Sequence, residues 1–247
     1  IGANLRKTNL QNANLEGANF KGAYLKGRNL STSDLSSANL SSANLKKADL
    51  TKATLQNANL KNADLTEATL KKVDFSEADL TGADLSGAEL NQADFSKAIL
   101  KGAKFQNADL RGAIFSDVDL REVDLSGANL RKIDFSGKDL RKTNFSETDL
   151  RKTNLRNCDL REANFFKADL RGAFLDDSNL EEAYLSSAFL QGTVLERANL
   201  QKAVLRYVVN LTGEQIQSAR IDKLTKVPSY LEVLWTSEET FECKDRD

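Results

Sequence analysis

Histidine and methionine are absent from the 247 residues, and the chain has one proline and two cysteines. The absence of histidine excludes catalytic triads, general bases and metal sites that depend on an imidazole. Two cysteines, Cys158 and Cys243, are too few for a thiolate zinc site, and their separation gives no reason to expect a disulfide. The glycines occur singly, so there is no phosphate-binding glycine loop. We therefore predict that the chain is not an enzyme and that it binds no metal or cofactor.

The chain also lacks an excess of charge of either sign, and it lacks long apolar runs. The 35 basic and 36 acidic residues give a net charge of −1, and the two signs are mixed along the chain. This balance predicts neither a nucleic-acid partner nor an anionic membrane surface. No apolar run is long enough to span a membrane, and no secretory signal segment is visible. By default we expect a cytoplasmic protein, and the absence of methionine indicates that the natural N-terminus precedes Ile1.

The strongest pattern present is a five-residue period. Every fifth residue from Leu5 to Leu205 is leucine or phenylalanine, without interruption. Around these central residues the chain reads Ala-Asp/Asn-Leu-x-x, as in Ala48-Asp49-Leu50. A continuous helix would scatter the central side chains, because five residues advance about 140° beyond a full turn. A straight strand would send successive central residues to opposite faces, because its side chains alternate with period two.

All central residues can point inward only if the chain bends once in each pentapeptide and closes into a coil. The residue two positions before the centre then shares the inward side, because it alternates with its neighbours as in a strand. A narrow coil has no room for a second large residue, which explains why alanine dominates at this position. The flanking positions face solvent and carry mostly polar side chains.

This repeat resembles that of the pentapeptide-repeat family, whose consensus is Ala-(Asp/Asn)-Leu-x-x, over residues 1–205. The resemblance implies an all-β fold, a right-handed quadrilateral parallel β-helix solenoid with four pentapeptides in each of about ten coils. We expect this β-helix over residues 1–205 and a C-terminal helical capping segment with a tail over residues 206–247.

A 20-residue period supports the four-sided coil. Phenylalanines at central positions then form columns on two opposite sides, with Phe75, Phe95, Phe115 and Phe135 on one and Phe105, Phe145 and Phe165 on the other. Arginines that follow the central residue also recur at this period, as Arg111, Arg131, Arg151 and Arg171 on one face and Arg121, Arg141 and Arg161 on the opposite face. Most of them belong to an Asp-Leu-Arg triplet, which places an aspartate on the same outward side. We interpret these ladders as solvated salt-bridge faces, with anion binding as the alternative.

The repeat pattern stops after Leu205. Thr212 and Gln215 have the spacing of a capping box, which predicts a helix start there and an end by Pro228. A second short apolar segment follows at residues 229–235, and the acidic remainder is expected to fray. Near this end, apolar residues occupy outward positions that are usually polar: Phe166, Phe174, Tyr184, Phe189, Val194 and Val204. We expect the C-terminal segment to pack over them as a cap, with an interaction or dimer surface as the alternative.

Two charged residues, Arg28 and Lys138, stand at inward positions where alanine is expected. An unpaired buried charge is very costly, so we expect both side chains to extend outward along the coil. The inward residues near Lys138 are also larger than alanine, including Thr148 and Cys158.

The five-residue repeat is regular, and the sequence shows no cluster of reactive side chains. We therefore predict a non-catalytic structural or scaffold protein that mediates protein–protein interaction. The partner is unknown, and a homodimer through one end of the solenoid is one candidate assembly. The alternative function comes from the family resemblance, since some members inhibit or protect a type II topoisomerase such as gyrase by mimicking duplex DNA. Those members are strongly acidic, whereas this chain is nearly neutral.

Overall fold

The computed structural model describes residues 8–237 and 240–246. It divides into two compact units, Ile1–Asn129 and Leu130–Asp247. The expected start of the β-helix at residues 1–7, and residues 238–239 and 247 of the expected tail, lie outside the described residues. Over the two ranges that are described, no helix is long and apolar enough to cross a membrane.

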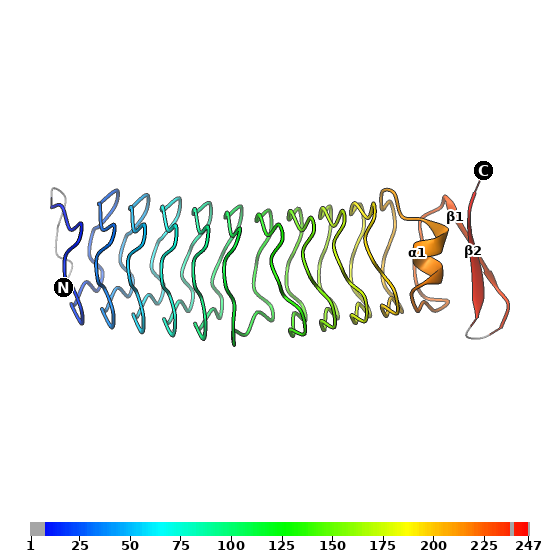
Figure 1. Ribbon diagram of the computed structural model, residues 1–247, viewed down its shortest axis with the longest axis horizontal. Helices are drawn as coiled ribbons and strands as arrows, with labels where there is room; N and C mark the ends of the chain where they lie inside the picture. The colour runs from blue at the N-terminus through cyan, green and yellow to red at the C-terminus, as the bar shows by residue number, and fades with distance from the viewer. Residues whose placement is uncertain (1–7, 238–239, 247) are drawn as a thin grey trace. The chain divides into compact units, whose positions relative to one another are not determined.

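Both units are right-handed quadrilateral β-helices, as the repeat predicted. Residues 20 positions apart form parallel β-bridges, such as Asn39 with Asn59 in the first unit and Asp139 with Asp159 in the second. Four pentapeptides therefore complete one coil, and Figure 1 shows the successive coils within each unit. The N–H of a central residue donates to the next coil, as Leu50 does to the carbonyl of Thr69 at 2.8 Å.

A β-turn makes each corner of the coil. The carbonyl of the central residue accepts the N–H three residues later, as Leu50 does from Ala53 at 2.9 Å. The third residue of the turn has a left-handed backbone, with φ 58° at Lys52 and 67° at Gly82. Because this conformation is easiest for glycine and asparagine, both recur at that position.

The Asp or Asn before the central residue caps the same corner. Its Oδ1 accepts the backbone N–H two residues later, as Asp49 does from Thr51 at 2.9 Å and Asp74 from Ser76 at 2.8 Å. Hydrogen bonds of this Asx type stabilise turns. Sequence reasoning placed these side chains in solvent without a specific role; the capping bond explains why Asp and Asn are preferred over other polar residues.

The central residues form the core of each unit. In the first unit Phe75 stacks on Phe95 and Phe95 on Phe115, with ring centroids 5.2 and 5.3 Å apart. In the second unit Phe145 stacks on Phe165 at 5.1 Å. The expected phenylalanine columns are thus confirmed within each unit. Each buried leucine or phenylalanine contributes about 1.5–3 kcal/mol relative to exposure.

The described residues of the C-terminal segment form a helix and a hairpin (Figure 1). The helix α1 spans Gly213–Gln217 and begins with the predicted capping box, in which Thr212 accepts from the N–H of Gln215 and the Gln215 side chain accepts from the N–H of Thr212. The helix has only five residues, so the expected continuation toward Pro228 was wrong. Strands β1, Leu231–Trp235, and β2, Phe241–Asp245, pair antiparallel.

The acidic tail was expected to fray, and β2 corrects this for residues 241–245. Cys243 is buried on the inner side of the strand, and the ring of Phe241 lies 5.4 Å from that of Trp235. These apolar contacts and the ladder with β1 hold a segment whose composition is mostly polar.

Coil geometry continues beyond Leu205, and the C-terminal segment closes the end. Arg220 pairs with Asn199 and Lys226 with Val204 in parallel bridges, although the pentapeptide pattern has ended. The N–H of Leu205 donates to the carbonyl of Lys226 at 2.8 Å. The segment therefore satisfies backbone groups that the last coil would otherwise expose, which is the role of a solenoid cap.

Candidate protein-interaction surface

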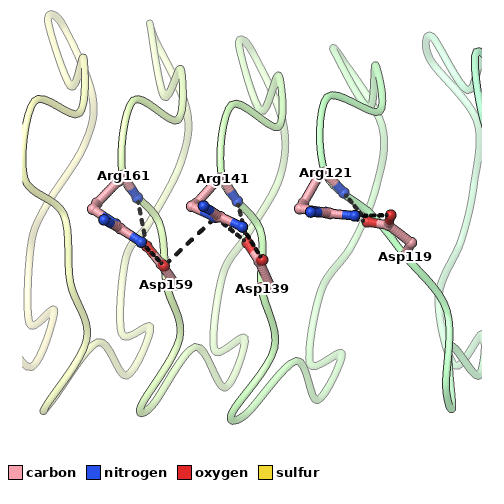
Figure 2. A network of polar contacts seen from close by, with 6 residues as sticks. All are labelled: Asp119, Arg121, Asp139, Arg141, Asp159 and Arg161. Carbon is pink, nitrogen blue, oxygen red and sulfur yellow. Dashed lines mark hydrogen bonds and ion pairs between the residues drawn. The ribbon is translucent and has the colours of Figure 1, made fainter.

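Aspartate and arginine of the same repeat pair on the coil surface. In Asp139-Leu-Arg141, the arginine Nε and Nη2 donate to the two carboxylate oxygens at 2.9 and 2.7 Å. Figure 2 shows this pair with the equivalent ones at Asp119–Arg121 and Asp159–Arg161. The same two-point geometry holds for Arg111, Arg151 and Arg171 with Asp109, Asp149 and Asp169.

These pairs stabilise the charged form of the carboxyl groups. The Arg111 guanidinium holds the pKa of Asp109 below its usual value, and Arg161 does the same for Asp159. The bidentate geometry occupies both oxygens of each carboxylate. The arginine side chains remain 36 to 56% exposed, so each pair contributes only modestly to stability.

In the second unit the ion pairs form two ladders, one on each of two opposite sides of the coil. Consecutive pairs lie ten residues apart along the chain and alternate between the two sides. Arg141 also reaches Asp159 of the next coil at 3.6 Å, and Arg151 reaches Asp169 at 3.4 Å. Arg131 differs from the other arginines, because Asn129 rather than aspartate precedes its central leucine. Six of the seven ladder arginines thus carry an intrarepeat counter-charge, and each such pair is neutral rather than basic.

The apolar residues near the C-terminal end share one repeat position, directly before the central residue, except for Phe166, which follows one. Their β-bridges place Phe174 with Val194, Tyr184 with Val204 and Phe189 with Val209. Because consecutive repeats occupy consecutive sides, these three columns cover three adjacent sides of the second unit. We call the following residues the apolar band: Phe166, Phe174, Tyr184, Phe189, Val194, Val204 and Val209.

The apolar band replaces corner caps. One coil earlier, Asp169 occupies the position of Phe189 and accepts the N–H of Arg171. In the same way, Asn164 occupies the position of Tyr184 and accepts the N–H of Phe166. Phe189, one coil after Asp169, has no acceptor atom to offer the amide two residues later, and neither Phe174 nor Val194 in the neighbouring column has one. Each replacement gives up a hydrogen bond worth about 0.5–1.5 kcal/mol net.

The C-terminal segment leaves part of the apolar band uncovered. Tyr184 and Phe189 are 42% and 40% exposed, so the expectation that a cap packs over these two residues was wrong. The reason is that α1 and the hairpin close the open end of the last coil, where Gln215 donates to the carbonyls of Leu190 and Thr193. Other members are half-buried by neighbours on the band itself: the Phe166 ring lies 6.0 Å from that of Tyr184.

Arginines border the apolar band. The guanidinium of Arg156 lies over the ring of Phe174, 4.2 Å from its centroid, and that of Arg171 lies 6.0 Å from the centroid of Phe189. A cation above an aromatic face is attracted by the ring quadrupole. These contacts place a cation against the face of each ring.

A groove opens where the last coil meets the hairpin, and it continues from the band at Val209. Its volume is about 540 Å³. Val208 and Leu211 form a buried apolar floor. The remaining lining residues are Asn210, Tyr230, Asp245 and Arg246. Sequence reasoning missed this groove because its residues come from three separate stretches of the chain.

The two inward charges are half-buried. Arg28 and Lys138 each keep part of the side chain exposed, and the Arg28 Nε donates to the carbonyl of Lys26 at 3.2 Å. Two enlarged inward residues near Lys138 also have a backbone partner: Thr153 Oγ1 donates to the carbonyl of Leu130 at 3.0 Å, and Cys158 Sγ donates to that of Phe135 at 2.9 Å. Both are bonds to the preceding coil, which explains how polar inward residues are accommodated.

No metal centre is formed by the residues at 8–237 and 240–246, where no cluster of three or more carboxylate or thiol side chains is placed to hold an ion. The described surface therefore offers ion-paired ladders, a partly exposed apolar band and a groove, and all but two of the ladder arginines lie in the second unit.

The chain is similar to solved structures of pentapeptide repeat proteins, among them HetL, Rfr23 and QnrB1. HetL of Nostoc sp. strain PCC 7120, involved in heterocyst differentiation regulation, is 30% identical, covers 90% of this chain and 90% of its own, and has a TM-score of 0.48. Rfr23 of Cyanothece 51142 is 29% identical over 43% of this chain and 89% of its own, with a TM-score of 0.27. QnrB1, a plasmid-mediated fluoroquinolone resistance protein, is 18% identical over 86% and 92%, with a TM-score of 0.27.

No curated protein matches the sequence. Two family models do, and together they cover most of it. The model for the pentapeptide repeat region matches residues 88–165, and the model for pentapeptide repeats in eight copies matches residues 1–36, 18–57, 33–71, 58–96 and 178–208. This chain belongs to the pentapeptide-repeat family.

Proposed function

We propose that the protein is a non-catalytic scaffold that binds another protein through the apolar band of its second unit. The observation that carries this proposal is the replacement of corner-capping Asp and Asn by large apolar residues that remain at the surface. Such replacements give up turn hydrogen bonds and expose hydrophobic area, and neither change benefits the isolated chain.

The composition of the apolar band supports a protein partner. Tyr184 and Phe189 are rigid aromatic side chains with large exposed areas, and aromatic residues and arginine carry much of the binding energy in protein interfaces. Arg156 and Arg171 border the rings and already have carboxylate partners, so they can form a polar rim without a charge left unpaired. A second copy of this chain is one candidate partner.

DNA mimicry receives less support. A protein that imitates duplex DNA needs rows of carboxylates that are available to a basic partner. Six aspartates on the ladder faces instead accept two hydrogen bonds each from an arginine of their own repeat. A DNA supercoiling assay with gyrase tests this alternative, and we expect no effect of the protein at micromolar concentration.

Affinity capture from extracts of the source cell tests the proposal. The variant Tyr184→Asn/Phe189→Asn restores the repeat consensus at both positions, so it should fold while losing the aromatic surface. The matched control is Ile99→Asn/Ile114→Asn, which removes exposed apolar residues from the same repeat position in the first unit. We expect the first variant to lose the captured partner and the control to retain it. Equal capture by both variants would refute a role for the apolar band.

A further inference from the structure

The C-terminal hairpin has one open strand edge, and the bonds at its two ends show which residues form it. At one end, the N–H of Thr236 donates to the carbonyl of Thr240 at 2.9 Å. At the other end, the N–H of Arg246 donates to the carbonyl of Tyr230 at 2.8 Å. Bonded and non-bonded pairs alternate along an antiparallel ladder, so the even-numbered residues of β1 bond to β2. The backbone groups of the odd-numbered residues therefore point away from β2.

The open edge belongs to β1. Over residues 8–237 and 240–246, the N–H groups of Val233 and Trp235 have no hydrogen-bond acceptor. The outer edge of β2 instead packs against the start of α1, because a Cβ at Gly213 would lie 2.9 Å from the carbonyl oxygen of Cys243. β1 also lacks the lysine, proline or bulge with which proteins usually block a free edge.

Apolar side chains lie on both faces of this edge. Leu234, on the outer face, is 46% exposed. Val233 and Trp235, on the inner face, are half-buried. An occupant of the edge therefore needs backbone hydrogen-bonding groups in an extended conformation, with apolar side chains on its two faces.

Glu232 distinguishes between two kinds of occupant. It is the one charged residue of β1, and no cation of the described residues forms an ion pair with it. Lys244, its neighbour in β2, lies 3.7 Å from Glu242 instead. A second copy of β1, paired antiparallel about Val233, would place Leu234 opposite Glu232 and supply no cation. The charge therefore favours a basic segment of another protein.

We propose that the free edge of β1 binds an extended, antiparallel segment of another protein. The segment places apolar residues opposite Val233 and Leu234 and a lysine or arginine opposite Glu232. In such strand addition the main-chain hydrogen bonds provide affinity and the alternating side chains provide specificity. The inference goes beyond the proposed function, because it requires neither Tyr184 nor Phe189.

Fluorescence anisotropy with the labelled peptide Thr-Val-Leu-Val-Lys-Thr tests the proposal. In the proposed register the second valine of the peptide lies opposite Val233 and its lysine lies opposite Glu232. N-methylation of that valine removes the N–H that would donate to the edge, and it should weaken binding at least about fivefold. Glutamate in place of the peptide's lysine should weaken binding at least about fivefold as well.

Variants of the chain provide matched readouts. Glu232→Lys should weaken binding of the lysine peptide at least about fivefold and strengthen binding of the glutamate peptide. Glu242→Lys is the matched control, because it makes the same charge change at an exposed residue of β2, one strand farther from the edge. It should change binding less than about twofold. Tyr184→Asn/Phe189→Asn should bind the peptide as wild type does.

Equal binding of the N-methylated and unmodified peptides, or equal effects of Glu232→Lys and Glu242→Lys, would overturn the proposal. So would failure of the wild-type chain to bind the lysine peptide. Sedimentation of the wild-type chain as a dimer that the peptide dissociates would also overturn it, because the edge would then bind a second copy. Cellular capture that needs the apolar band, without peptide binding, refutes only the strand addition and leaves the proposed function intact.

Discussion

Gln215 links the cap to the β-helix, and Gln215→Ala should loosen the last coil. Its Nε2 donates to the carbonyl of Leu190 at 3.0 Å and to that of Thr193 at 2.7 Å. Its Oε1 accepts the N–H of Thr212 at 2.8 Å within the capping box. Alanine removes all three bonds and leaves only water to replace them.

The magnitude follows from these bonds. At about 1 kcal/mol net for each, and with water able to reach part of the site, the loss should be about 2–3 kcal/mol. The effect should be local, because a coil in a solenoid contacts only its neighbours. If the amides of the last coil exchange through opening of the cap, a loss of this size speeds their exchange by roughly 30- to 150-fold.

Amide hydrogen exchange measures this directly. The reporters are the N–H groups of Leu200 and Leu205, which donate to the carbonyls of Arg220 and Lys226 at 2.7 and 2.8 Å. Leu70, in the first unit, is the internal reference and should not change. Gln217→Ala is the matched control, because Gln217 belongs to the same helix and is exposed. Equal protection of Leu200 and Leu205 in wild type and Gln215→Ala would refute the capping role.

Three further predictions concern the repeats. Ile99→Asn should stabilise the first unit by about 0.5–1 kcal/mol, because Asn can cap the N–H of Lys101 while the 52% exposed isoleucine loses little burial; urea denaturation checks this. The carboxyl pKa of Asp159 is lowered by Arg161, so its stabilising contribution is complete above the unfolded pKa near about 4 and disappears as pH falls through the lower folded value. Wild type should therefore lose stability below about pH 4 more steeply than Asp159→Asn, as followed by circular dichroism. Burial raises the pKa of Cys158 to about 11, so a thiol reagent at pH 8 should modify it only after the protein is unfolded; fast labelling of the native chain would contradict its inward position.

Local regularities of the sequence predicted much of this structure. The five-residue period forces one bend in each repeat, because no continuous helix or strand points Leu50, Leu55 and Leu60 inward together. The Thr212–Gln215 spacing predicted the start of α1, since a capping box is a contact between residues three apart. The Asp-Leu-Arg triplets predicted the ion pairs, because two residues that flank an inward leucine share the outward side.

Features that depend on distant contacts were missed. Strand β2 has a polar composition, and only pairing with Leu231–Trp235 and burial of Cys243 make it a strand. The groove joins Val208 to Tyr230 and Arg246, which no spacing rule connects. The exposure of Tyr184 could not be foreseen, because the direction in which the C-terminal segment closes the coil decides it.

Site-specific photocrosslinking in the source cell tests the central claim most directly. A benzophenone amino acid in place of Phe189 samples the apolar band, and the same amino acid in place of Lys104 samples the equivalent, exposed repeat position in the first unit. We predict a discrete crosslinked protein from position 189 and none from position 104. Crosslinking of the same proteins from both positions, or of none from position 189, would contradict a protein-binding role for the apolar band.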